Sequence, residues 1–120
     1  MKGLHLSLLI LLLASGVAIA QTPCENGMSG IYPCDEFELY AFLPLEEVGG
    51  GVKGNDCWGW VDDMSGREFV LFGRTNGMAV VEISDPESPI YLAEVPPNAL
   101  TAIWRDIKVI GNYAFIVSDV

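Results

Sequence analysis

The residue types that most often carry catalysis are scarce in this chain. Its only histidine is His5, which lies in an apolar N-terminal run. Residues 21–120 therefore contain no histidine, and this rules out a Ser-His-Asp triad, a Cys-His pair or a histidine metal site within them. We expect no catalytic residue in this segment.

Acidic side chains form the next candidate group, because calcium prefers oxygen ligands such as carboxylates. Asp56, Asp62 and Asp63 lie close in sequence to Gly54 and Gly66. Their spacing matches no calcium-binding loop, and acidic residues are common in β-turns for reasons unrelated to metals. We therefore expect no cofactor here, with a calcium site as the alternative.

The chain has three cysteines. Cys24 and Cys34 flank a turn-rich segment, and such a pair forms a disulfide in an oxidising compartment. A metal site is the alternative, but two thiols without a histidine make a poor one. Cys57 lies in an apolar run without a basic neighbour. We predict that it is a buried free thiol, with a reactive thiol as the alternative.

The first 20 residues predict a secretory signal peptide. Lys2 precedes the apolar run Leu4–Leu13, and Ala18-Ile19-Ala20 forms a cleavage site before Gln21. An uncleaved membrane anchor is the alternative. Residues 21–120 keep 16 acidic and five basic side chains, a formal charge of −11. Such a surface repels nucleic acid and anionic lipid, so we expect neither as a partner.

Short apolar runs separated by turn residues predict antiparallel strands. The runs are rich in β-branched and aromatic residues and too short for helices. Residues Phe37–Leu43 alternate with period two and predict a further strand, whereas the glycine-rich residues 46–55 predict a loop. The other predicted strands are Cys57–Val61, Phe69–Phe72, Met78–Ile83, Ile90–Val95, Asp106–Ile110 and Tyr113–Val117.

Part of this pattern occurs twice. Arg67–Gly73 matches Asn112–Ser118 at an offset of 45 residues, and a second match, at an offset of 46, pairs Trp58 with Trp104. A four-stranded repeat of about 40–50 residues is typical of a β-propeller blade. We therefore predict an all-β fold, a β-propeller fragment with one blade over Cys57–Val95 and half of the next blade. A coincidental likeness of ordinary hairpins is the alternative.

The predicted blade is apolar on both faces. Val80 and Val81 are adjacent on one strand, so their side chains point to opposite faces. One blade cannot bury both faces, and a propeller needs about four to eight blades. We therefore expect an N-terminal fragment of a longer protein. In that protein, Phe37–Leu43 would be an outer strand that closes the ring by completing the last blade.

The blade pattern gives two further groups of residues a role. Arg105 and Asp106 stand at the start of an inner strand, which makes them candidates for lining a central channel; a structural ion pair is the alternative. Trp58, Trp60 and Trp104 could stack on sugars. Their place in the repeat favours packing between blades instead.

Several of these segments resemble known proteins. GMAVVEISDPESPIYLAEV, residues 77–95, resembles the LVIVD repeat in its V-V-[DE]-I-S core and D-P-x-x-P turn. TPCENGMSGIYPC, LPLEEVGG, GNDCWGW, SGREFVLFG and WRDIKVIGNYAFIVS resemble, in this order, the N-terminal region of the choice-of-anchor B family. The resemblance covers residues 22–120. It implies a secreted bacterial β-propeller, held at the cell surface by a C-terminal anchor that this sequence does not contain. It supplies no catalytic residues to transfer.

These observations predict a secreted or cell-surface binding or scaffold module, with an extracellular ligand or a cell-surface component as its partner. The alternative is an extracellular propeller enzyme, a hydrolase or a lactonase-like protein, whose catalytic residues would lie in further blades. The predicted organisation has three parts. Residues 1–20 are the signal peptide, residues 21–50 hold the cysteine loop, outer strand and glycine-rich connector, and residues 51–120 hold the blade and the start of the next.

Overall fold

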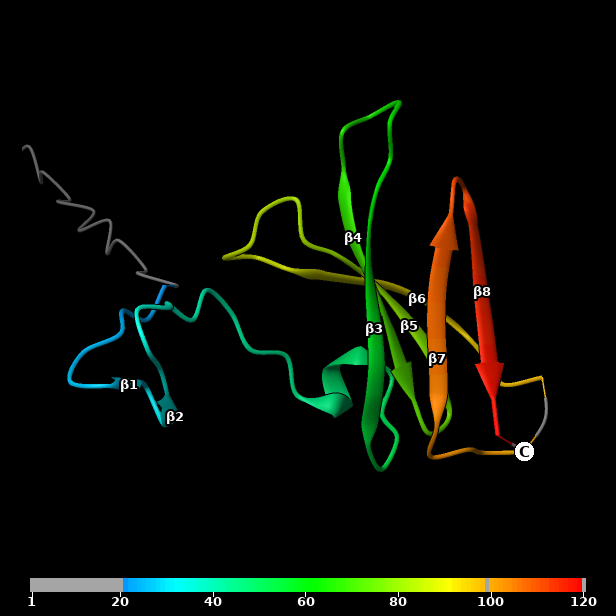
Figure 1. Cartoon of the computed structure of the whole chain (residues 1–120), viewed down its shortest axis with the longest axis horizontal. Helices are drawn as coiled ribbons and strands as arrows, with labels where there is room; N and C mark the ends of the chain where they lie inside the picture. Colours follow the sequence, from blue (N-terminus) through cyan, green and yellow to red (C-terminus); the bar gives the residue numbers. More distant parts are fainter. Residues whose placement is uncertain (1–20, 99, 120) are drawn as a thin grey trace, which may run out of the picture.

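The protein is all-β and antiparallel in a computed structural model that describes residues 21–98 and 100–119 (Figure 1). The predicted signal peptide, His5 included, lies outside the described residues. None of the helices in the described part of the chain is long and apolar enough to cross a membrane. The elements are β1 (Met28–Ser29), β2 (Tyr32–Pro33), the 3-10 helix η1 (Leu45–Val48), β3 (Gly54–Val61), β4 (Glu68–Arg74), β5 (Gly77–Glu82), β6 (Ile90–Val95), β7 (Arg105–Ile110) and β8 (Tyr113–Ser118).

The central unit is a four-stranded sheet in the order β3-β4-β5-β6. Each strand pairs with the next in sequence, as expected for a blade, and Thr75-Asn76 forms a two-residue turn between Arg74 and Gly77. The predicted loop over residues 46–55 is only partly correct. Residues 45–48 form η1, and β3 begins at Gly54 because Gly54 pairs with Arg74 and lengthens the ladder.

Strands β7 and β8 form a separate hairpin beside β3 (Figure 1). Its ladder corrects one part of the repeat alignment. Leu71 matches Ile116 at the offset of 45 residues, and these two pair with Trp58 and Ile107, respectively. Trp58 is therefore equivalent to Ile107, not to Trp104. The sequence match slipped because six residues separate the paired ends of β3 and β4, against two between β7 and β8.

Both faces of the sheet carry part of the core. On one face Val48, Ala79 and Val81 are buried, with Leu43 and Leu45 packed against them. Because η1 and the chain before it cover only part of this face, an apolar groove of about 350 Å³ remains open.

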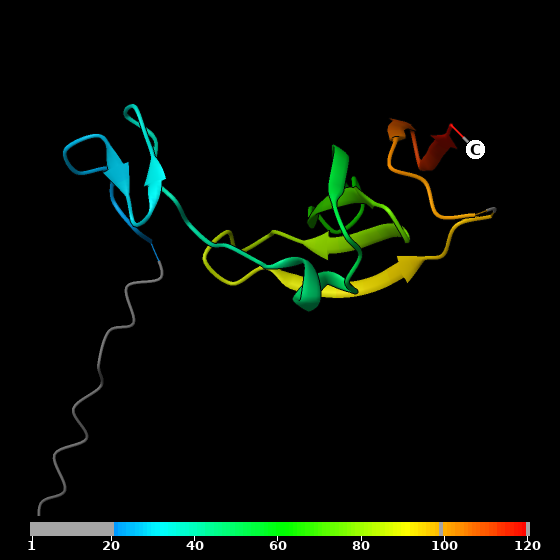
Figure 2. The ribbon, with the colours of Figure 1, turned by 90° about the horizontal axis from the view of Figure 1, so that it is seen from below.

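The β7–β8 hairpin covers the opposite face. Ile107 is fully buried between Leu71 and Met78, and Val109 and Ile116 pack at the edge of this cluster. Figure 2 shows the hairpin as a layer of its own, apart from β5 and β6. The adjacent residues of β4 and β5 thus contribute to two different cores, as the apolar pattern predicts.

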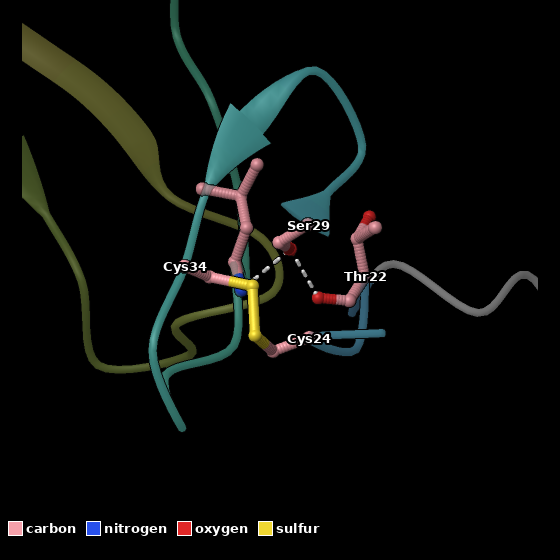
Figure 3. The surroundings of a disulfide bond; sticks show 5 residues. Thr22, Cys24, Ser29 and Cys34 are labelled. Carbon is pink, nitrogen blue, oxygen red and sulfur yellow. Dashed lines mark hydrogen bonds between the residues drawn. A yellow bond between two sulfur atoms is a disulfide. The ribbon is translucent and has the colours of Figure 1, made fainter. Parts of the chain in front are cut away.

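Residues 22–39 form an N-terminal module that contains a disulfide and lies apart from the blade (Figures 1 and 2). Cys24 and Cys34 form the predicted disulfide. Inside the module, the buried hydroxyl of Ser29 donates to the carbonyl oxygen of Thr22 at 2.6 Å and accepts from the backbone N–H of Leu39 at 3.3 Å (Figure 3). Thr22 and Leu39 also exchange two backbone hydrogen bonds. The module is thus held by the disulfide, by one buried hydroxyl and by the backbone hydrogen bonds between Thr22 and Leu39.

The prediction of a strand over Phe37–Leu43 is wrong for this structure. The segment forms only the isolated bridge between Thr22 and Leu39 and leads on to η1 without a ladder. Its side chains Phe37 and Phe42 are exposed. The apolar alternation is present, but among the described residues no strand lies beside this segment to pair with its backbone.

The first prediction concerns the disulfide. A variant with Cys24→Ser and Cys34→Ser should lose about 2–3 kcal/mol of local stability on the chain-entropy model, because the unfolded loop gains conformational freedom. We expect faster hydrogen exchange at the amides of Thr22 and Leu39 and unchanged exchange in β4. Cys57→Ser is the matched control and should leave all these rates as they are. Equal protection of Leu39 in both variants would show that the disulfide does not hold the module.

Candidate functional site

The turn between β4 and β5, which we call the Arg74 turn (Arg74, Thr75 and Asn76), makes hydrogen bonds to several segments that are distant in sequence. The Thr75 hydroxyl accepts a hydrogen bond from the Val52 N–H at 2.8 Å. The backbone of Thr75 donates to Lys53 O at 3.1 Å and accepts from the Ala102 N–H at 3.2 Å. Thr75 is itself buried. This one turn therefore fixes both the glycine-rich loop before β3 and the connector before β7.

The Arg74 side chain extends this network on one face of the sheet. It is fully buried, and its guanidinium donates to Gly50 O at 3.1 Å and to the Glu94 carboxylate at 3.0 Å. Gly49 makes the arrangement possible. Its φ is +91°, and a Cβ there would stand 2.5 Å from Arg74 Nη1. Only glycine fits this conformation and this space.

Arg105 lies on the opposite face. It is 4% exposed, and its Nε donates to the backbone oxygen of Arg74 at 2.9 Å. Asp106 follows it in β7 and is exposed, because successive side chains of a strand point to opposite faces. Within the described chain no ion pair joins these two residues. That they line a channel stays a prediction.

Sequence reasoning missed the polar contacts that hold the hairpin to the blade. The Asp56 carboxylate accepts from the Ile107 N–H at 2.8 Å and from Lys108 Nζ at 3.4 Å. Asn55 donates to Ile103 O at 2.6 Å. The backbone hydrogen bond from Ile107, followed by the charge of Lys108, holds the pKa of Asp56 below its usual value, although partial burial opposes this. In the sequence, Asp56 is a candidate only as a calcium ligand; its role in holding the hairpin has no local signal, because its partners lie about 50 residues further along the chain.

Two of the three tryptophans, Trp58 and Trp60, contact the hairpin from the blade, as predicted. The Trp60 indole stacks on Phe69 with ring centroids 5.4 Å apart and donates to Gly111 O at 3.1 Å. Lys108 Nζ lies 4.5 Å from the centre of the Trp58 ring, a cation–π contact. Trp104 is 64% exposed, and its packing between blades stays a prediction.

The remaining candidates are not brought together. Asp62 caps its own turn by bonding to Ser65 and to the Met64 N–H, at the far end of β3 from Asp56. Within residues 21–98 and 100–119, no three His, Cys, Asp or Glu side chains are grouped to hold a metal ion. Cys57 is free but exposed, so its predicted burial is wrong. Cys57 lies on β3, which is an edge strand of the sheet, and no other strand of the described chain pairs with its outer edge.

The end of the blade away from the Arg74 turn carries a third ion pair. Arg67 Nε donates to Glu82 Oε1 at 2.8 Å, and Nη2 bonds the other carboxylate oxygen. Arg67 and the Ser84 hydroxyl lower the pKa of Glu82 to about 2. Because Arg67 is half exposed, we assign this pair a role in fixing the β4–β5 register rather than a ligand site.

Comparison with known proteins agrees with the repeat. A model of the LVIVD repeat matches residues 69–95, which contain most of β4 with β5 and β6, and residues 103–119, which contain β7 and β8. No curated protein and no solved structure matches the chain. The fold and the two matches define the class: an all-β, propeller-type fragment with two stretches that match the LVIVD repeat.

Our second prediction concerns pH. The pKa of Asp56 is lower in the folded state than its unfolded value of 3.8. Asp56 therefore stabilises the docking of the hairpin at pH values above 3.8, and this contribution is lost as the pH falls through the lower pKa of the folded state. Asp56→Asn should therefore reduce the protection of the Ile107 amide near neutral pH, and the difference from wild type should shrink below about pH 4. Asp63→Asn is the control, since Asp63 makes no such contact. A difference that does not depend on pH would contradict the assignment.

The third prediction concerns close packing at Gly73. A Cβ at this position would lie 3.2 Å from Asp56 O and 3.4 Å from Arg105 Cβ. Gly73→Ala should therefore push β7 off the blade and cost about 1–3 kcal/mol, as overpacking does. Gly59→Ala is the matched control, because a Cβ at Gly59 meets nothing within 4 Å. Hydrogen exchange at the Ile107 amide in both variants tests this, and equal protection would refute it.

Proposed function

We propose that this chain is the N-terminal part of a secreted or cell-surface β-propeller that acts as a binding or scaffold module. Its likeness to the choice-of-anchor B family supports a place at the cell surface. The disulfide between Cys24 and Cys34 supports an oxidising compartment. The formal charge of −10 for the whole chain makes nucleic acid and anionic membranes poor partners.

One observation carries the binding role. The outer face of the β7–β8 hairpin, which we call the hairpin face, bears four large apolar side chains exposed by 55–75%. They are Ile110, Tyr113, Phe115 and Val117. A sheet with this pattern is stable in water only when another apolar surface covers it. We propose that the cover is a further β-sheet of the same repeat type.

The opposite end of the molecule supports the same proposal. The apolar groove on the blade is lined by Val70, Phe72 and Val81, together with Tyr40 and Pro86. The extended segment Phe37–Leu43 runs beside this groove without strand partners. We propose that it completes a neighbouring blade and closes the ring, which would cover the groove.

The fourth prediction tests the hairpin face. The chain is expressed with residues 1–20 in an exporting bacterial host, and the mass of the recovered protein should show an N-terminus at Gln21. Without its partner sheet, the wild-type protein should self-associate, because the exposed apolar face is removed from water in this way. Phe115→Asp should shift the population to monomer in light scattering. Met64→Asp, at a 95% exposed turn residue, is the control.

Two results would contradict the proposal. A wild-type protein that is monomeric and unfolds in a sharp cooperative transition would show that the face needs no cover. Equal association of wild type and Phe115→Asp would show that another surface is responsible.

A further inference from the structure

Arg105 is a buried cation that has no counter-ion among residues 21–98 and 100–119. It is 4% exposed, and its Nη2 atom has no hydrogen-bond partner. The guanidinium of arginine keeps its charge in proteins, and a buried charge is costly unless an opposite charge or strong acceptors compensate it. The only bond that Arg105 makes within the described residues uses Nε. The other edge of its guanidinium is therefore free to bind an acceptor.

The nearby acids do not fill this role. Glu94 bonds the Arg74 guanidinium. The Arg74 side chain lies on one face of β4. Arg105 lies over Gly73 on the opposite face, because successive residues of a strand point to opposite faces. The Asp56 carboxylate is occupied by Ile107 and Lys108.

Arg105 lines a pocket between the blade and the hairpin. The pocket has a volume of about 460 Å³, with Met78, Val95 and Ile116 on its apolar side. Asn98 and Ser118 add an amide and a hydroxyl to the lining. The site thus combines one buried positive charge and neutral hydrogen-bonding groups with a short apolar wall.

We propose that this pocket binds a carboxylate on a short aliphatic body. A carboxylate has two oxygens in one plane, which match the two-pronged edge of a guanidinium. One guanidinium compensates one negative charge, whereas a phosphate dianion would bring an excess charge into a strongly acidic protein. The three apolar residues favour a hydrocarbon chain behind the carboxylate.

The carboxylate has two sources. It is either a free aliphatic acid or the glutamate side chain of an extended peptide. The second source fits the edge of β8, which pairs only with β7 in the described chain and lies beside the pocket. In the first repeat, the strand at the corresponding edge of β4 is β5, and the residue that pairs with Gly73, the equivalent of Ser118, is Met78. The proposal concerns a pocket on the inner side of the hairpin, and it does not depend on the hairpin face being a binding surface.

Arginine side-chain signals test the proposal directly. Arg67, Arg74 and Arg105 are the three arginines of the chain, so the exported protein that begins at Gln21 should give three Nε–H correlations, assigned with Arg67→Gln and Arg105→Gln. The first probe is butyrate, with methyl butyrate as its uncharged control. The second is a capped peptide with the sequence of residues 77–84, with the same peptide carrying glutamine for glutamate as its control.

We expect the Arg105 signal, and not the Arg67 signal, to shift on titration. Arg105→Gln should weaken binding about tenfold or more, because a charge-assisted hydrogen bond is lost. If that variant does not fold, Arg105→Lys retains the charge but lacks the fork and should also bind more weakly. Shifts with butyrate assign the site to free acids, and shifts with the glutamate peptide alone assign it to a strand. Equal shifts with a probe and its uncharged control, or no shift with any probe, would overturn the proposal.

Discussion

The Arg74 turn is the feature on which the arrangement of the other elements depends. Hydrogen bonds to Thr75 and to the Arg74 backbone reach the glycine-rich loop, the connector before β7 and Arg105 at the start of β7. These elements are far apart in sequence, and none of them has a regular ladder with the others. Because the turn is buried, a lost bond would leave an unsatisfied polar group, which costs more than the bond itself contributes. The turn therefore sets where the hairpin begins and where the blade is covered.

Apolar packing then divides the molecule into two layers. Adjacent residues of β4 and β5 point to opposite faces, so the sheet needs cover on both sides. The hairpin covers one face through Ile107, and η1 covers part of the other through Val48. The outer face of the hairpin is also apolar and exposed, so it needs cover in the same way as the sheet does. Each layer of this fold thus exposes an apolar face that only another layer can bury, which is the physical basis of a repeat architecture.

Polar contacts decide how the hairpin is oriented on the blade. Asn55, Asp56 and Trp60 lie along β3 and bond to the start, middle and tip of the hairpin. They fix β7 alongside β3, whereas apolar contacts alone would tolerate sliding. Close approach at Gly73 brings Arg105 into the interface, where burial leaves its charge uncompensated. The contacts that orient the hairpin are therefore also the origin of the candidate carboxylate site.

The sequence by itself determined the strands of the blade and of the hairpin, the two apolar faces of the blade, the disulfide and the repeat. These depend on local periodicity, on turn residues such as Asn76-Gly77 and on the spacing of Cys24 and Cys34, all of which are visible within a few residues. Only the tertiary structure decided the role of Asp56 and the exposure of Cys57. Their partners or their exposure depend on segments about 45–50 residues away or on a face without cover. The sequence comparison also paired Trp58 with the wrong residue of the second repeat. The turn between β3 and β4 is longer than the turn between β7 and β8, and this difference shifts which residues are equivalent in the two ladders. The uncompensated burial of Arg105 had no sequence signal at all, since it results from the packing of one repeat on the other.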